Sequence, residues 1–350
     1  MDRNKLQMYP EDNFGALALV QKRSMFGFID KTGKFVIEPQ FNNAQGFSEG
    51  LAAVEVKEKW GYIDKTGNFV IEPRFRLAFP FSEGLAVVEV GIKGRAFTFA
   101  RDARGDITLV DVEKIFSYID KMGNFVIEEM FNLAGHFSEG LAAVEFWGKW
   151  GYINRKGKVI IKPKFRWAWH FSGGFAPVLL KNKWGFLDHS GKEVVEPQFN
   201  DAQGFSEGLA AVKVKEKWGY IEKSGEFIIK PRFDSARDFF QGLAPVNVGD
   251  KWGYIDKRGE FLTELQFDNA WGFAEGLASV KVGDKWGYID NTGKILIEPQ
   301  FDSAKDFSEG LAGVEIKGKW GYINKGGNFV IEPKFDYAEN FSNSVRLNTI

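Results

Sequence analysis

A repeat of 34 residues runs through most of this 350-residue chain. A Trp-Gly pair occupies the same place in seven copies of this repeat, and from Trp150 onward the step between these copies is always 34 residues. Phe26 and Phe116 stand at the equivalent place in two degenerate copies, so nine units follow one another. A unit of this size cannot bury its own aromatic side chains, and its neighbours must cover them. The core is therefore expected between units. The Trp-Gly position falls at residues 26, 60, 116, 150, 184, 218, 252, 286 and 320.

Each unit contains three short runs rich in Val, Ile, Phe, Tyr and Trp, most clearly in residues 307–340. Such runs, bounded by turn residues, predict β-strands. An Asp-x-x-Gly sequence separates the second run from the third and is typical of a tight turn with glycine at positive φ. We interpret the recurring Asp as an acceptor of backbone hydrogen bonds in the turn, not as a catalytic group. Pro follows the third run in seven units and is expected to end the strand ladder there.

Open sheets rarely exceed about ten strands, so nine three-stranded units cannot form one flat sheet and must either coil or close. Two architectures are therefore possible. We expect an all-β array of three-stranded antiparallel units in an open β superhelix, or solenoid. The alternative is a closed, propeller-like ring, whose blades usually have four strands and about 40–45 residues. The open form is favoured because residues 14–20 already provide a first strand and the chain ends in a worn copy of it. The domain boundaries are then a tail at 1–13, the array at 14–341 and a C-terminal cap strand at 342–350.

Composition excludes several classes of function. With no Cys and three His, neither a disulfide framework nor a metal or cofactor site is expected. The 46 Lys+Arg and 47 Asp+Glu give a net charge of -1, which argues against nucleic-acid binding. The sequence has no run of about 18 apolar residues, so we expect no membrane insertion. Residues 1–10 lack the apolar stretch of a signal peptide, which favours the cytoplasm unless a leader preceded them. We expect a monomer.

The recurring motif K-W-G-Y-I-D-K-x-G-x-F-V-I-E-P-x-F resembles the WG-repeat (KWG-repeat) family of bacterial β-rich arrays. The resemblance covers residues 14–341. It departs from the pattern at Phe116-Ser117, which replaces Trp-Gly, and at Leu265, where Pro is missing. The resemblance implies a bacterial source and a binding or scaffolding module, and it implies no reaction.

Four of the eleven tryptophans lie outside the repeated position: Trp147, Trp167, Trp169 and Trp271. In a repeat protein, columns that vary between units are free to specify a partner. Other units place polar residues there, which predicts exposure, and exposed Trp suits interface hot spots or stacking on sugar rings. His170 and Trp271 are included as extensions of this binding patch. Local repacking around an irregular unit is an equally weighted alternative.

An insertion at residues 91–115 separates the first two strands of the third unit and is predicted to form a β-hairpin arm. Arg95, Arg101 and Arg104 make its first half basic. Long excursions from a regular scaffold are frequently functional, so a docking arm is expected. We treat the Arg104-Gly105-Asp106 tripeptide as coincidence.

These features predict a non-enzymatic scaffold that presents a curved repeat surface to a partner. A protein is the expected partner, with a glycan second. The alternative is a carbohydrate-active enzyme or lectin on a propeller-like scaffold, since carboxylate pairs abound. No histidine spacing, nucleophile elbow or phosphate-binding loop supports catalysis.

Overall fold

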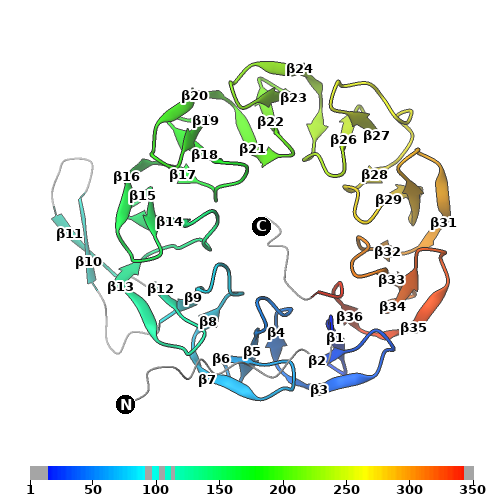
Figure 1. The fold of residues 1–350 in the computed structure, drawn as a ribbon, viewed down its shortest axis with the longest axis horizontal. Helices are drawn as coiled ribbons and strands as arrows, with labels where there is room; N and C mark the ends of the chain where they lie inside the picture. Colours follow the sequence, from blue (N-terminus) through cyan, green and yellow to red (C-terminus); the bar gives the residue numbers. More distant parts are fainter. Residues whose placement is uncertain (1–14, 91–96, 102–106, 112–114, 343–350) are drawn as a thin grey trace, which may run out of the picture.

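The computed structural model describes residues 15–90, 97–101, 107–111 and 115–342. Within these residues the chain forms β-strands and no helix. Nine small antiparallel sheets, the blades, stand around a central axis as a closed β-propeller (Figure 1). The prediction of nine antiparallel β units is confirmed, and the preferred open superhelix is wrong. The predicted tail at 1–13 lies outside the described residues, as does the predicted cap strand except for Ser342.

Each blade has up to four strands, which we call innermost, second, third and outer. The innermost strands are short: β4 (Asn43–Ala44), β8 (Leu77–Ala78), β17 (Trp167–Ala168), β21 (Asp201–Ser206), β25 (Ser235–Ala236), β28 (Asn269–Ala270), β32 (Ser303–Ala304) and β36 (Tyr337–Ala338). The second strands, which number the blades 1 to 9, are β1 (Ala18–Lys22), β5 (Ala52–Val56), β9 (Ala86–Glu89), β14 (Leu141–Phe146), β18 (Phe175–Leu180), β22 (Leu209–Val214), β26 (Leu243–Val248), β29 (Leu277–Val282) and β33 (Leu311–Ile316).

The third strands carry the Trp-Gly position: β2 (Met25–Ile29), β6 (Lys59–Ile63), β12 (Phe116–Ile119), β15 (Lys149–Asn154), β19 (Lys183–Asp188), β23 (Lys217–Glu222), β27 (Lys251–Asp256), β30 (Lys285–Asp290) and β34 (Lys319–Asn324). The outer strands are β3 (Phe35–Phe41), β7 (Phe69–Phe75), β13 (Phe125–Phe131), β16 (Val159–Phe165), β20 (Glu193–Phe199), β24 (Phe227–Phe233), β31 (Ile295–Phe301) and β35 (Phe329–Phe335). In blade 4 an isolated bridge replaces the innermost strand, and in blade 7 two isolated bridges replace the outer one.

The ring closes because the C-terminal end of the array completes the first blade. Strand β36 pairs with β1, with Val20 opposite Ala338. The Glu339 N–H also donates to the Leu19 carbonyl at 2.8 Å, and Ser342 bridges Leu17. The same exchange occurs around the ring, since the crossover that leaves one unit supplies the innermost strand of the next blade, or in blade 4 the isolated bridge of Ala134 with Val144. The sequence analysis missed this fourth strand because it is only two residues long in most units.

The core lies between blades, as predicted. Nine apolar clusters fill the nine interfaces between neighbouring blades. The cluster that joins blade 9 to blade 1, for example, contains Trp320 and Tyr322 beside Ala18. The buried Tyr322 hydroxyl donates to the Glu339 carbonyl at 2.6 Å, and six other blades repeat this bond. Seven of the nine blades are thus tied to the crossover that follows them, while blades 1 and 5 have Phe28 and Phe186 at this position.

The glycine of the Trp-Gly pair and the recurrent proline face each other. In blade 2, Tyr62 pairs with Ile71 but Trp60 pairs with Phe75, so the outer strand bulges opposite Gly61. A Cβ on Gly61 would lie 2.5 Å from the Ile71 carbonyl oxygen and 2.7 Å from the nitrogen of the following proline. The prediction that this proline ends the ladder is wrong. It lies inside β7, because an outer edge strand can lose one N–H donor at a bulge without losing a partner.

The Asp-x-x-Gly turns have the predicted structural role. The Asp290 carboxylate accepts backbone N–H bonds from Thr292 at 2.9 Å and Lys294 at 3.1 Å, and Gly293 has φ 87°. The hydroxyl of Thr292 also donates to Asp290 and lowers the pKa of this carboxyl. The hydrogen bonds of the turn therefore engage these carboxylates.

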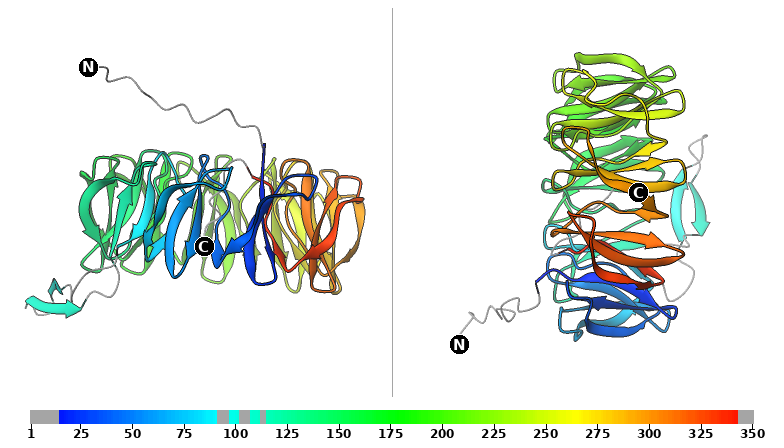
Figure 2. Two further views of the ribbon diagram at one scale, coloured as in Figure 1. Left: turned by 90° about the horizontal axis from the view of Figure 1, so that it is seen from below. Right: turned by 90° about the vertical axis from the view of Figure 1, so that its right-hand side faces the viewer.

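The meander divides the connections between two faces of the ring. The crossover face carries the turns between second and third strands and the crossovers from each outer strand to the next blade. The opposite face carries the Ser-Glu-Gly and Asp-x-x-Gly turns. The insertion enters on the crossover face at blade 3, where the Val90 N–H donates to the Ile115 carbonyl at 2.8 Å. Its strands β10 (Phe97–Arg101) and β11 (Ile107–Asp111) pair as the predicted hairpin, drawn outside the ring of blades (Figure 2).

Candidate partner-binding surface

Trp147 occupies the turn between the second and third strands of blade 4. Its side chain is 66% exposed and its backbone has φ 50°. The same turn position holds Lys57, Lys215 or Lys317 at nearly the same φ in other blades, and Gly249 or Gly283 in two more. A bulky residue at positive φ is disfavoured, and exposing an indole to water adds no compensating burial. Stability of the fold therefore does not explain a tryptophan here.

Trp167 lies in the innermost strand of blade 5, one blade further along the ring. Its ring centroid is 5.1 Å from that of Trp150, the Trp-Gly tryptophan of blade 4, and 38% of Trp167 remains exposed. Trp150 is only 8% exposed, whereas Trp218 is half-buried, and Ser235 stands at the place equivalent to Trp167 in the blade after it. Trp167 thus covers Trp150 with one side and presents the other to solvent. Both interpretations of the extra tryptophans, local repacking and an exposed binding surface, therefore fit Trp167.

Leu133 occupies the equivalent position in blade 4 and was missed by the sequence analysis. It is 39% exposed, and its carbonyl accepts a hydrogen bond from the Glu145 N–H two residues before Trp147. Four other units place Asn or Ser in this column. The column also holds Leu77, Trp167 and Tyr337, so the available signal was a large residue at a place where four units have a small polar one. We call Leu133, Trp147 and Trp167 the crossover-face patch.

Trp169 and His170 lie at the inner rim, where the chain turns from the innermost strand toward the second strand. The Trp169 N–H donates to the Pro177 carbonyl at 3.0 Å, and its carbonyl accepts the Tyr152 hydroxyl at 2.7 Å. The Trp169 ring lies 5.9 Å from that of Trp167, so the two are neighbours. His170 packs on His136 of the preceding blade, with ring centroids 5.0 Å apart. Both residues are half-buried, unlike Trp147.

Burial controls the charge of this histidine pair. It lowers the pKa of His136 to about 4, and the neighbouring His170 adds to that effect. Burial also lowers the pKa of His170, although Glu139 opposes the shift. Both imidazoles are therefore neutral near pH 7.

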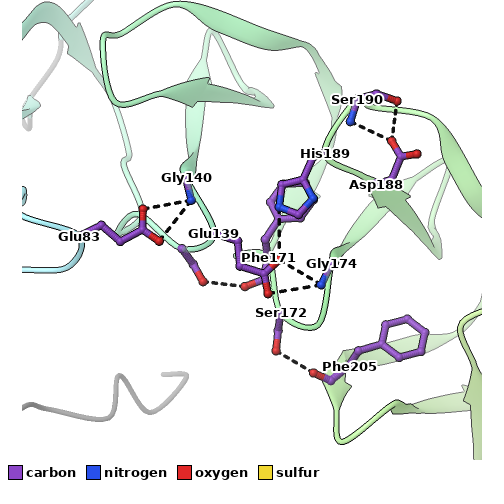
Figure 3. A network of polar contacts seen from close by, with 11 residues as sticks. Glu83, Glu139, Gly140, Phe171, Ser172, Gly174, Asp188, His189, Ser190 and Phe205 are labelled. Carbon is purple, nitrogen blue, oxygen red and sulfur yellow. Dashed lines mark hydrogen bonds and ion pairs between the residues drawn. The ribbon is translucent and has the colours of Figure 1, made fainter.

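The third histidine belongs to a structural network between blades 4 and 5. The Glu139 carboxylate accepts the Gly174 N–H at 3.0 Å and pairs with the His189 Nε2 at 3.2 Å (Figure 3). The His189 ring stacks on Phe171 with centroids 4.3 Å apart. At equivalent places in other blades a lysine pairs with the glutamate, as Lys257 does with Glu207 at 3.1 Å. The network repeats around the ring and is not specific to a site.

Trp271 does not join the crossover-face patch. It lies in blade 8, three blades beyond Trp169, and is 46% exposed. The Arg237 guanidinium stacks on its ring at 3.6 Å and lies 4.9 Å from the ring of Trp252. The structure therefore separates Trp271 from the tryptophans of blades 4 and 5.

The arm and the patch share one face of the ring. The insertion replaces the second-to-third-strand turn of blade 3, and Trp147 occupies the same turn of blade 4. Arg101 ends strand β10, while Arg95 and Arg104 lie outside the described residues. Two features that interrupt the repeat pattern are thus consecutive on the crossover face.

The described residues contain no group of three or more His, Cys, Asp or Glu side chains placed to hold a metal ion. Across the same part of the chain, no helix has the length and apolarity that crossing a membrane requires.

The fold and its repeated positions define the class of protein: a nine-bladed propeller built from Trp-Gly units. The family model described as "WG containing repeat" matches residues 26–60, 60–93, 116–150, 150–184, 184–218, 218–252, 252–286, 286–320 and 320–345. The chain therefore belongs to the WG-repeat family, which confirms the resemblance seen in the sequence.

Two solved structures show the same kind of ring. One is titled "Crystal structure of the eukaryotic initiation factor"; it matches with a TM-score of 0.62 and 12% identity over 95% of this chain and 100% of that one. The other, the dihydro-heme d1 dehydrogenase NirN, matches with a TM-score of 0.50 and 12% identity over 96% of this chain and 76% of that one. No match to a curated protein was found. At these identities the likeness concerns the fold alone.

Proposed function

We propose that this chain is a non-enzymatic binding protein that holds a protein partner on the crossover face of blades 3 to 5. The observation that carries the proposal is Trp147, a largely exposed indole at φ 50° where other blades have Lys, Arg or Gly. A large rigid aromatic on a rigid scaffold is the usual anchor of a protein interface. Trp167 and Leu133 extend the apolar surface on the same face.

The recurring polar groups support a scaffold role. Carboxylates such as Asp290 are held in turns by backbone N–H groups, and glutamates such as Glu139 bridge neighbouring blades. Buried tyrosines donate to crossover carbonyls, as Tyr152 does to Trp169 at 2.7 Å. Because these residues recur in blade after blade, their role is to build the propeller. The columns left for recognition are those that change from unit to unit.

The insertion supports the same location. It departs from the repeat one blade before Trp147, at the equivalent turn and on the same face, so a partner that spans blades 3 to 5 would cover the place where the arm leaves the ring. A face that combines an exposed aromatic anchor with an irregular excursion from a regular scaffold suits protein recognition.

A quantitative pull-down tests this proposal. The immobilised protein captures partners from an extract of its source cells, beside a Trp147→Lys/Trp167→Asn variant that restores residues found at the same columns of other blades. We expect the wild type to retain specific proteins that the variant loses, with both chains equally folded by circular dichroism. Trp271→Asn, an equally drastic change of an exposed indole in blade 8, is the matched control and should capture normally. Equal capture by all three chains would contradict the proposal.

A glycan is the second candidate, and a different observation favours it. Trp271 presents an exposed indole face held by Arg237, an arrangement suited to stacking on a sugar ring with polar groups beside it. A glycan array separates the two functions, because glycan binding at this position would be lost in Trp271→Asn and kept in the Trp147→Lys/Trp167→Asn variant.

A further inference from the structure

The crossover face carries a regular row of ion pairs on one side of the ring. In these blades a lysine at the start of the third strand pairs with an aspartate in the following crossover, as Lys217 does with Asp234 and Lys251 with Asp268, both at 2.6 Å. The Lys217 ammonium lowers the pKa of Asp234. The row comprises Lys217–Asp234, Lys251–Asp268, Lys285–Asp302 and Lys319–Asp336. Here the lysine charges are neutralised within the repeat.

On the side of the patch the same columns carry like charges. Arg76 follows Lys59, and Arg166 follows Lys149, at the spacing that elsewhere joins lysine to aspartate. All four side chains are exposed, and none forms an ion pair with another described residue. The Arg166 guanidinium donates to the amide oxygen of Asn182, which is neutral. Arg at two places where four other blades have Asp therefore leaves these cations without the ion pair that the repeat forms on the other side of the ring.

Two of these cations, Lys149 and Arg166, border the aromatic patch directly, whereas Lys59 and Arg76 lie two blades earlier in the ring. Lys149 is two residues from Trp147, and Arg166 immediately precedes Trp167. A surface that alternates exposed indoles with unpaired cations complements a segment that carries both carboxylates and apolar side chains. Exposed like charges within one column add little to the stability of the fold, and an anionic partner reduces the repulsion between them.

We propose that the partner bound on the crossover-face patch is a protein segment in which acidic side chains alternate with aromatic or aliphatic ones. This inference rests on the proposed function and names the chemistry of the partner. A polynucleotide is less well matched, because the apolar members Leu133, Trp147 and Trp167 need side chains to pack against, and the whole chain carries a net charge of -1.

Fluorescence anisotropy tests the inference with defined probes. The full chain is titrated into a fluorescein-labelled copolymer of Glu and Tyr, with a copolymer of Lys and Tyr and a single-stranded oligo-dT as comparators. We expect the Glu–Tyr copolymer to bind more tightly than either comparator. Added salt should weaken that binding, since exposed charges are screened beyond about 8–10 Å at physiological ionic strength.

An Arg76→Asp/Arg166→Asp variant isolates the charge. It restores the aspartate found at the same column in blades that form the Lys–Asp pair, so the fold is expected to keep its stability. Binding of the Glu–Tyr copolymer should fall by about tenfold or more, because an attractive charge at two places becomes a repulsive one. Lys156→Asp/Arg258→Asp makes the same change of net charge on the opposite face, in the turns Asn154–Gly157 and Asp256–Gly259, and should leave binding unchanged.

The outcomes separate this inference from the proposed function. If Trp147→Lys/Trp167→Asn abolishes binding but the Lys–Tyr copolymer binds as tightly as the Glu–Tyr copolymer, the patch is a binding surface and the acidic partner is wrong. If the Arg variant loses binding and the Trp variant keeps it, the cations recruit acidic chains but the aromatic patch is not their site. Equal or tighter binding of oligo-dT would overturn the inference in favour of a nucleic acid.

Discussion

Replacing Gly321 by Ala tests why the Trp-Gly pair recurs. Gly321 is the glycine of that pair in blade 9, and its φ is not positive, so the substitution acts through space alone. The added Cβ would lie 2.5 Å from the Ile331 carbonyl oxygen, 2.7 Å from the Pro333 nitrogen and 2.9 Å from the Glu332 carbonyl carbon. All three contacts are with backbone, which cannot rotate away as a side chain can. The outer strand must move, or its bulge must open.

Two further glycines set the scale for this change. At Gly313, in the neighbouring strand of the same blade, the nearest atoms to an added Cβ are at 3.6–3.7 Å, which is ordinary contact. Gly253 is the Trp-Gly glycine of blade 7, where the proline is missing, and its Cβ would meet backbone oxygens at 3.1 and 3.2 Å. Overpacking costs about 1–3 kcal/mol and more against fixed backbone, so we expect a loss of about 3 kcal/mol at Gly321 and about 1 kcal/mol at Gly253. Gly313→Ala should gain about 0.5 kcal/mol, because alanine reduces the entropy of the unfolded chain.

Urea unfolding followed by tryptophan fluorescence measures the three free energies of unfolding. The explanation requires the order Gly321→Ala least stable, Gly253→Ala intermediate and Gly313→Ala at or above wild type. If Gly321→Ala were as stable as Gly313→Ala, the glycine would not be explained by the bulge, and the close approach of the two strands would be wrong.

Three other measurements follow from contacts in the ring. Because burial holds the pKa of His136 near 4 and lowers that of His170, the protein should be fully stabilised above pH 6.5 and lose about 2 kcal/mol as pH falls toward 4; urea midpoints across that range should show a smaller loss in a His136→Asn variant. Ser206→Ala removes the hydroxyl that donates to the Phe239 carbonyl of the next blade at 2.7 Å and should cost about 1–2 kcal/mol in urea unfolding, whereas an unchanged midpoint would show that this inter-blade bond adds nothing. Trp147→Lys should change the melting temperature little, since lysine holds the same φ in other blades; a large drop would make Trp147 part of the core.

Periodicity accounts for most of what the sequence predicted about the fold. The fixed step between Trp-Gly pairs identified nine units, and the size of a unit placed the core between them, where Trp320 and Tyr322 indeed lie. The innermost strand escaped notice because two residues such as Ser303–Ala304 carry no alternating pattern. Without that strand, neither the four-stranded blade nor the pairing of β36 with β1 was visible. The error about proline arose because sequence does not reveal which strand is an edge.

Exceptions to the repeat predicted part of the candidate surface. Trp147 stood out because its column otherwise holds Lys, Gly or another small or polar residue, and it is the most exposed of the four extra tryptophans. Trp271 was grouped with the others by its column, but column identity does not give angular position around a ring. Leu133 and the unpaired Arg76 and Arg166 were passed over because Leu and Arg are common residues. Their significance depends on the neighbours that other blades place beside them.

The closure of the ring can be measured directly because the chain contains no native cysteine. Val20 and Ala338 lie directly opposite each other where β1 pairs with β36, although they are far apart in sequence. Side chains at such cross-strand positions approach closely enough for a disulfide. After mild oxidation of a Val20→Cys/Ala338→Cys variant, a closed propeller predicts an intramolecular disulfide in most molecules, seen as a mobility shift on a non-reducing gel. Free thiols in a folded, monomeric sample would contradict the closed ring and return the open superhelix.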